Sequence, residues 1–351
     1  MMKGKFFIYM AFCSAMCWSA CSGDADAPSD KQTEDIRVSA VVEEVKMMSR
    51  SAGEDAYTGT VPSPDKELNA AVWFSLTSGS YPEASGTSEY NLPVHTGINF
   101  KSGTATFPDE LTEEERPKYP TDGSPVYCVG FYPNTGWELV ADDATKATHA
   151  ITGKQDLMFA PEITGSWDSH FSTQHYRHLL TWLKVCVCTT TAEAGSYWGK
   201  LQKITLNDVP TSLTVDLTKK EKETDADPEF VQKNAVAFSE GTEGKADIPI
   251  LNNAEGIELA LTTQDVASVF CHPSNKYYLD IECENGTAMN VEVQLKPLTN
   301  TEEELKKLEY PAGLQYVLIL YFHPFNVVDG VCTLQEWNAQ NEDLYPDPVT
   351  P

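Results

Sequence analysis

From about residue 68 onward, short runs rich in apolar residues follow one another along the chain, separated by polar stretches. Short runs such as 70–77 (AAVWFSLT), 98–107 (INFKSGTATF) and 125–133 (PVYCVGFYP) are rich in β-branched and aromatic residues. Clusters of Gly, Pro, Asn and Ser separate these runs. Short runs separated by such turn-forming residues are typical of strands and turns in an all-β protein.

One hairpin is predicted more sharply than any other element. Its two strands carry alternating apolar residues, namely Tyr277, Leu279, Ile281 and Cys283, then Met289, Val291, Val293 and Leu295. Between them, the pair Asn285-Gly286 predicts a type I′ turn, which needs a positive φ at both residues. We therefore expect a hairpin with one buried face and one exposed face.

The last part of the chain predicts one short helix and one doubly buried strand. Thr301 and Glu304 have capping-box spacing, Leu305 and Leu308 follow on one face, and Pro311 ends the helix. Residues 314–322 are apolar at almost every position, as expected for a strand buried between two layers.

The N-terminus has the layout of an export signal. Basic residues Lys3 and Lys5 precede the apolar run 6–20, which is too short to span a bilayer, and small residues lead to Cys21. The small residues before Cys21 resemble a lipobox, in which the cysteine is acylated and becomes the first mature residue. An ordinary cleaved signal, or acylation at Cys13 or Cys17, is the alternative. The polar stretch 23–30 (GDADAPSD) then reads as an acidic tether.

Four segments follow from these patterns. Residues 1–20 form a lipoprotein signal peptide, and residues 21–53 form an acidic tether with one strand, in which Ile36, Val38, Ala40 and Val42 alternate with polar or small residues. Residues 54–167 and 168–351 are expected to form two β-sandwich domains.

The net charge limits which molecules the chain can bind, and the cysteines leave two structural states open. The 351 residues include 52 acidic and 25 basic side chains, a net charge of −27, so nucleic acid is excluded as a partner. Six cysteines lie beyond the signal region. Free buried thiols and one or two disulfides both remain open for them, and Cys186 and Cys188 should point to the same face of a strand.

Candidate catalytic chemistry is missing from the sequence. It contains no Gly-x-Ser-x-Gly, His-Glu-x-x-His, phosphate loop or Cys-x-x-Cys motif. His170, His175 and His178 do not have the spacing of a zinc site, and a polar loop is the expected state of this stretch. We predict no enzyme activity, no cofactor and no metal.

Several ordered segments together resemble the fimbrillin family of Bacteroidetes. They are the lipobox-like Cys21 with its acidic tether, 131–137 (FYPNTGW), 154–161 (KQDLMFAP) with 178–187 (HLLTWLKVCV), and 312–322 with 331–337 (VCTLQEW). The resemblance implies two consecutive Greek-key, transthyretin-like sandwiches and a lipoprotein on the cell outer membrane. It also implies assembly with other subunits into fimbriae that support adhesion and biofilm formation, with no enzyme activity and no cofactor. Partners would be other fimbrial subunits, membrane lipid through the acylated cysteine, and ligands on host or bacterial surfaces. A tethered glycan-binding lipoprotein is the alternative function.

The resemblance also implies proteolysis-triggered strand exchange. A protease would cut between Arg50 and Ser51, with Lys46 as an alternative site, and the strand at 36–42 would leave. Arg50 is one of only four arginines and precedes the flexible run 51–53. The replacement strand would come from the C-terminal end, where residues 331–337 are strand-like and a polar, Pro-rich tail follows.

Overall fold

The computed structural model describes residues 34–42, 68–82, 90–92, 95–101, 104–107, 111–219, 235–296, 312–325 and 327–335. Nearly all regular structure in these ranges is strand, so the all-β prediction is confirmed. The predicted helix at 301–311 lies outside the described residues. Within the described ranges, no helix is long and apolar enough to span a bilayer.

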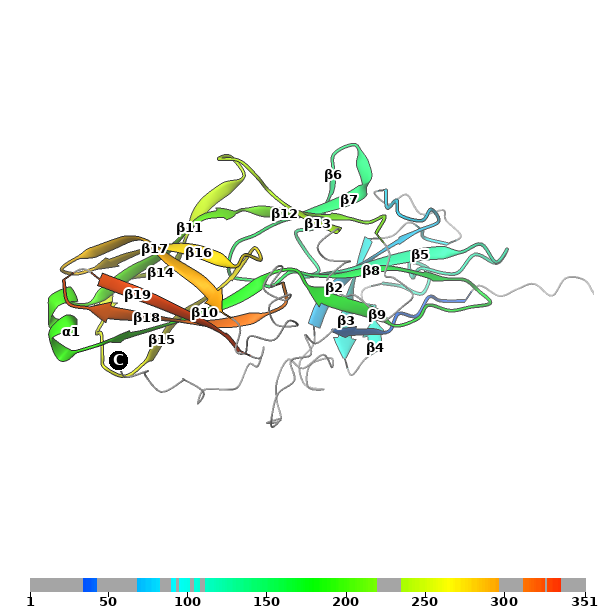
Figure 1. Ribbon diagram of the computed structural model, residues 1–351. Helices are drawn as coiled ribbons and strands as arrows, with labels where there is room; N and C mark the ends of the chain where they lie inside the picture. Colours follow the sequence, from blue (N-terminus) through cyan, green and yellow to red (C-terminus); the bar gives the residue numbers. More distant parts are fainter. Residues whose placement is uncertain are drawn as a thin grey trace, which may run out of the picture. The chain divides into compact units, whose positions relative to one another are not determined.

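A seven-stranded sheet and a four-stranded sheet enclose the first core (Figure 1). The seven-stranded sheet has the order β1 (Ala40–Val42), β9 (Gln174–His178), β8 (Met158–Gly165), β5 (Val126–Tyr132), β2 (Leu68–Ser75), β3 (His95–Lys101) and β4 (Thr104–Thr106). The four-stranded sheet has the order β13 (Val236–Phe238), β12 (Ser212–Asp216), β7 (Asp143–Ala150) and β6 (Glu138–Val140). Trp73, Phe131, Phe159, Leu213 and Val215 pack between the two sheets.

The seven-stranded sheet is buried on its other face as well. Along β2, Ala71 and Trp73 face the first core, whereas Ala70, Val72 and Phe74 belong to a second apolar cluster. Because side chains alternate between the faces of a strand, this strand is apolar at nearly every position. This second cluster contains the apolar residues of the candidate site described below.

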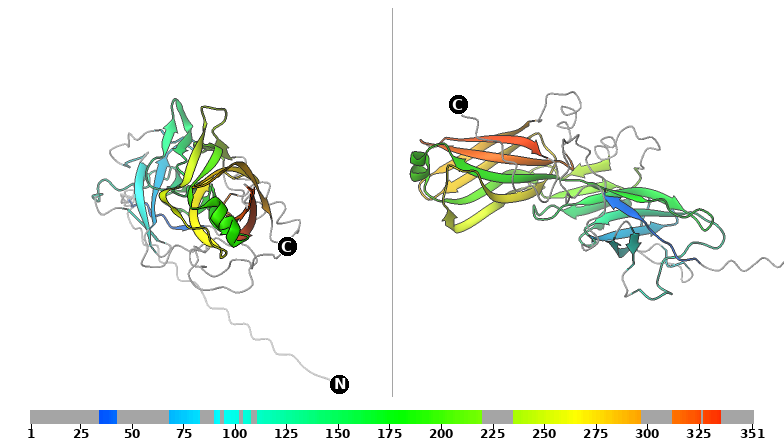
Figure 2. Two further views of the ribbon diagram at one scale, coloured as in Figure 1. Left: turned by 90° about the vertical axis from the view of Figure 1, so that its left-hand side faces the viewer. Right: turned by 90° about the horizontal axis from the view of Figure 1, so that it is seen from below.

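An eight-stranded sheet encloses a separate core. Its order is β14 (Lys245–Ile257), β11 (Leu201–Pro210), β16 (Lys276–Cys283), β17 (Thr287–Lys296), β19 (Val327–Gln335), β18 (Gln315–His323), β10 (Thr181–Thr189) and β15 (Gln264–Cys271). Strands from both halves of the sheet contribute to one core, so the sheet folds over on itself (Figure 2). Trp198 of the short helix α1 (Ala192–Trp198) also belongs to this core.

Strand β18 is buried on both faces, as predicted. Leu318 and Leu320 face the main core, whereas Val317 and Ile319 form a smaller cluster with Cys186 and Cys188 of β10. The two cysteines therefore share one face, which confirms the prediction from their spacing.

Strand pairing crosses the expected domain boundary at residues 167 and 168. Strand β9 pairs with β8, and β12 pairs with β7, although β9 and β12 both follow that boundary in the sequence. The first pair of sheets thus recruits segments from well beyond residue 168. The numbers of domains and of Greek-key units stay predictions.

The predicted hairpin is confirmed as β16 and β17, but its turn differs. The Cys283 N–H donates to the Gly286 C=O at 2.8 Å, which centres the turn on Glu284 and Asn285, and neither Asn285 nor Gly286 has a positive φ. The type I′ prediction was therefore wrong.

A bulge further along the hairpin explains a second difference. Leu279 is paired with Val291 but Ile281 with Ala288, and Asn290 adopts a φ of 53° in the extra length of β17. The bulge shifts the alternation by one residue. Met289 was predicted to face the core, yet it is 61% exposed.

Candidate assembly slot

The N-terminal segment 34–42 lies in an apolar slot beside the seven-stranded sheet. Ile36, Val38 and Ala40 are 2%, 3% and 1% exposed, while Arg37 between them is exposed. The predicted alternation is confirmed for these three residues, and the side chain of Val42 lies outside the described residues. Three inward side chains at alternate positions anchor the segment.

Backbone hydrogen bonds hold both edges of this segment. On one edge, the Ile36 N–H donates to the Pro117 C=O at 2.9 Å, and the Tyr119 N–H donates to the Glu34 C=O at 3.0 Å. On the other edge, the Gln174 N–H donates to the Ser39 C=O at 2.8 Å. Strand β1 then runs parallel to β9, with Ala40 opposite Gln174 (β1 is dark blue in Figure 1). The slot therefore offers backbone partners on two sides.

The floor of the slot is built from closely packed buried residues. Tyr119, Cys128 and Tyr176 are fully buried in the same cluster as Ile36. The Gln174 Nε2 donates to the Cys128 Sγ at 3.3 Å, and burial raises the pKa of the Cys128 thiol well above its usual value. Gly130 gives Tyr176 its space, because a Cβ at residue 130 would lie 2.2 Å from the Tyr176 Oη.

Basic groups gather at the start of the slot. The His170 Nε2 lies 3.3 Å from the Glu34 Oε2, and an Arg116 guanidinium nitrogen lies 3.9 Å from the Asp35 Oδ2. The backbone of Asp35 also bridges to Lys118. These charged groups are partly exposed, so we expect them to set the register of the strand more than its stability.

The sequence-predicted site residues lie outside this description. Cys21, Arg50, Ser51 and Lys46 all fall in parts of the chain that the structure does not describe. Their roles in lipidation and processing stay predictions.

Two of the three candidate histidines, His170 and His178, have separate acidic partners. His170 pairs with Glu34, whereas the His178 Nδ1 lies 2.5 Å from the Asp156 Oδ2, and His175 and His178 belong to β9 rather than to the expected polar loop. Among the residues described, no group of three or more His, Cys, Asp or Glu side chains is placed to hold a metal ion. The six described cysteines are buried.

The expected donor strand is part of a sheet. Val331 belongs to β19, which pairs with β18 along its whole length and with β17 at Cys332 and Thr333. Cys332 is fully buried in the core of the eight-stranded sheet. This strand would have to leave its own core before it could enter another subunit.

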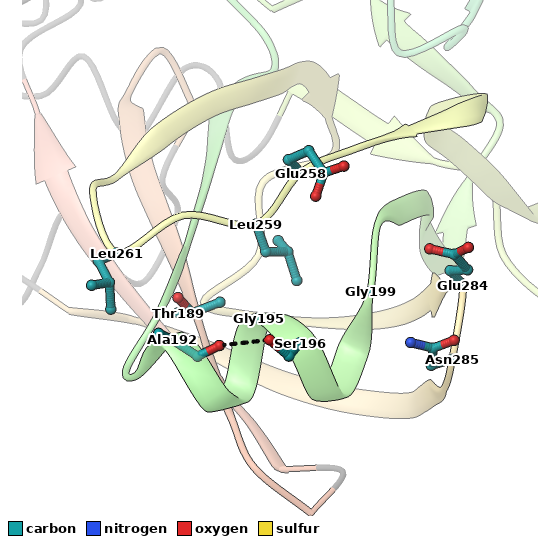
Figure 3. Close-up of a pocket in the computed structure, with 10 residues that line it drawn as sticks. All are labelled: Thr189, Ala192, Gly195, Ser196, Gly199, Glu258, Leu259, Leu261, Glu284 and Asn285. Carbon is teal, nitrogen blue, oxygen red and sulfur yellow. Dashed lines mark hydrogen bonds between the residues drawn. The ribbon is translucent and has the colours of Figure 1, made fainter.

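A separate shallow depression lies beside α1, with a volume of about 440 Å³. Figure 3 shows its lining arranged around one face of the helix: Thr189, Ala192, Gly195, Ser196, Gly199, Glu258, Leu259, Leu261, Glu284 and Asn285. The Ser196 Oγ donates to the Ala192 C=O at 3.2 Å, and the Asn285 N–H donates to the Trp198 C=O at 3.1 Å. The Asn285 N–H thus caps the C-terminal end of α1.

The Fimbrillin-like family model matches residues 66–309, which is more than half of the chain. The chain belongs to the fimbrillin-like family. Candidate cell adhesion proteins of known structure are similar to this fimbrillin-like chain. The one from Bacteroides ovatus is 13% identical, with a TM-score of 0.49 over 89% of this chain and 100% of the other. The one from Bacteroides uniformis is 12% identical, with a TM-score of 0.48 over 86% and 99% of the two chains. No curated protein matches this chain.

In this fimbrillin-like chain, the sequence predicted the segment that occupies the slot but not the residues that pair with it. The apolar alternation at 36–40 was visible, but nothing singled out residues 117–119 as its backbone partners. It also missed α1, although Thr191 accepts a hydrogen bond from the Ala194 N–H as an N-cap and Gly199 has a φ of 69° at the C-cap. These two caps were the local signals that could have located the helix.

Proposed function

We propose that this chain is a subunit of cell-surface fimbriae that assembles by strand exchange. In this proposal the precursor is exported and acylated at Cys21, which holds it at the outer membrane. A protease cuts between Arg50 and Ser51, and segment 34–42 then leaves its slot. A strand from a neighbouring subunit takes its place.

The observation that supports this proposal most directly is the way segment 34–42 is held. It contributes three buried apolar side chains to the cluster, and burying each large one stabilises the docked state by about 1.5–3 kcal/mol. Its removal would leave the Pro117 C=O, the Tyr119 N–H and the Gln174 N–H without these partners. Unpaired backbone groups beside apolar surface favour the addition of another strand.

The N-terminus of the assembled protein tests this proposal. Surface filaments carrying the chain should be sheared, purified and sequenced from the N-terminus, and we expect chains that start at Ser51. Arg50→Ala should block assembly, whereas Lys46→Ala serves as the matched control and should not. Filaments made of chains that still begin at Cys21 would exclude strand exchange by this route.

Lipidation is tested separately. Cys21→Ala should abolish acyl labelling and membrane retention of the precursor. Persistence of both in the variant would contradict the lipoprotein assignment while leaving the slot proposal intact.

A further inference from the structure

Three connections between strands meet at one end of the eight-stranded sheet, including the one that contains α1 (Figure 1). The Asn285 N–H donates to the Trp198 C=O at 3.1 Å, which joins the β16–β17 turn to α1. The Trp198 Nε1 donates to the His323 C=O at 2.7 Å, which joins α1 to the turn between β18 and β19. Connections at the end of a sandwich are where binding residues commonly lie, because strand pairing does not constrain their side chains.

Two aromatic side chains are exposed at this end. Tyr197 of α1 is 38% exposed, and Phe325 of the β18–β19 turn is 78% exposed. Their ring centroids lie 6.1 Å apart, and their planes are tilted by 55°. This spacing is within the range of interacting aromatic rings. Tyr197 and Phe325, called the aromatic pair below, therefore form one small apolar surface that is open to solvent.

The backbone at Phe325 is strained. Its φ is 66°, and it follows Pro324. A proline followed by a residue of positive φ is the arrangement of a type II turn, whose third residue is usually Gly or Asn. An aromatic residue there has a steric cost, and its exposure gives little apolar burial in return. Backbone strain that the fold does not require is a common feature of binding sites.

Buried contacts hold the aromatic pair in place. Trp198, the neighbour of Tyr197, is fully buried and packs edge-to-face on Phe322, with 5.4 Å between the ring centroids. The Phe322 C=O accepts a hydrogen bond from the Thr190 N–H at 3.0 Å, which ties β18 to the segment just before α1. Because both rings are carried by well-packed neighbours, a ligand that binds them orders few additional groups.

We propose that the aromatic pair is a binding site for uncharged carbohydrate. The C–H groups on one face of a sugar ring form an apolar patch that packs on an aromatic ring, while its hydroxyl groups bond to water or to polar side chains. This inference goes beyond fimbrial assembly and does not depend on strand exchange.

Charge favours an uncharged ligand. Glu193 lies on α1, and Glu258 and Glu284 line the depression beside it (Figure 3). The His323 Nε2 lies 3.2 Å from the Asp329 Oδ2 next to the β18–β19 turn. These carboxylates repel phosphates, acidic sugars and anionic lipid headgroups, whereas they accept hydrogen bonds from hydroxyl groups.

The small area of the aromatic pair argues against a protein partner. A stable protein interface covers about 800 Å² on each side. A whole aromatic side chain offers about 150–250 Å², so two partly exposed ones offer well under half of that requirement. A short stretch of sugar rings needs no larger surface.

Binding of the uncut full-length chain to a glycan array tests the inference. The probes are immobilised neutral oligosaccharides of glucose, mannose, galactose and xylose, with heparin and polysialic acid as acidic comparisons. We expect the chain to bind at least one neutral class and neither acidic probe. Isothermal titration with the bound oligosaccharide then gives its Kd.

Matched tyrosine variants locate the site. Tyr197→Ala should weaken binding at least about tenfold, because the apolar contact of one aromatic ring is lost. Tyr278→Ala is the control, since Tyr278 is 39% exposed and lies on β16 between the buried residues Tyr277 and Leu279. Its side chain faces away from the core, and its loss should leave the Kd unchanged.

Phe325→Asn separates binding from folding. Asn tolerates a positive φ, so this variant should melt at the wild-type temperature or above it, while binding weakens at least about tenfold. A purely structural Phe325 would give the opposite result, namely a lower melting temperature with unchanged binding.

Three results would overturn the inference: no neutral oligosaccharide binds, only acidic probes bind, or Tyr197→Ala and Phe325→Asn both bind like wild type. If no sugar binds and the double variant changes self-association in size exclusion, the aromatic pair is a protein contact and the inference is wrong. None of these results bears on cleavage after Arg50, so the proposed function is tested separately.

Discussion

Replacing Ile36 with Ala should loosen the N-terminal segment without unfolding the sheets. Ile36 is 2% exposed and packs in the cluster that contains Tyr119, Cys128 and Tyr176. Truncation of a buried Ile to Ala typically costs about 2–5 kcal/mol. A segment near the end of the chain can relax more readily than a central strand, so we expect a cost of about 2 kcal/mol here.

This cost predicts the population of molecules in which the segment is open. Each 1.4 kcal/mol is tenfold in an equilibrium constant, so about 2 kcal/mol corresponds to an open population about 30-fold larger. Hydrogen–deuterium exchange of the precursor, followed by mass spectrometry of peptides that cover residues 34–42 and 117–119, measures it. The amide protons of Ile36 and Tyr119 should exchange faster, because their hydrogen bonds join the segment to residues 117–119.

Arg37→Ala is the matched control for this experiment. Arg37 lies between the two largest anchors but is exposed, so its truncation should leave the exchange rates almost unchanged. Equal acceleration in both variants, or none in Ile36→Ala, would refute the view that alternate apolar side chains hold the segment in its slot.

Three further changes test other parts of the fold. Gly130→Ala should lower the melting temperature, because its Cβ would meet the Tyr176 Oη at 2.2 Å and overpacking typically costs about 1–3 kcal/mol. Asn290→Val should destabilise the protein by about 1–2 kcal/mol, because the φ of 53° there disfavours a β-branched residue, while Gly286→Ala should be close to neutral in the same thermal melts. Burial lowers the pKa of His272 from 6.5 to about 4, so protonation favours the unfolded chain. Stability present above about pH 6.5 should be lost progressively as the pH falls towards 4, and His272→Gln should flatten this loss in melts between about pH 7 and pH 5.

Local patterns in the sequence were enough to predict the strands and several of their faces. The alternation at Ile36, Val38 and Ala40, the shared face of Cys186 and Cys188, and the double burial of β18 all follow from the period of two in a strand. The family resemblance was likewise visible in ordered segments and is confirmed by the family match.

The turn of the hairpin shows where local reasoning fails. The pair Asn285-Gly286 favours a type I′ turn in isolation, but Glu284 and Asn285 donate their N–H groups to the Lys200 and Trp198 carbonyls at the end of α1. These contacts between distant segments accompany a turn centred one residue earlier. The bulge at Asn290 then reverses the orientation of Met289, which no alternation rule could reveal.

The slot itself is decided by tertiary structure. The sequence by itself determined that residues 36–40 form an extended segment with one apolar face. It did not determine that Pro117 and Tyr119 would meet one edge of that strand and Gln174 the other, because these residues lie about 75 to 140 positions away along the chain. The pattern along one sequence shows which face of a strand is apolar. The backbone partners of that strand depend on long-range pairing, because the backbone groups of all buried segments must be hydrogen-bonded in the same fold.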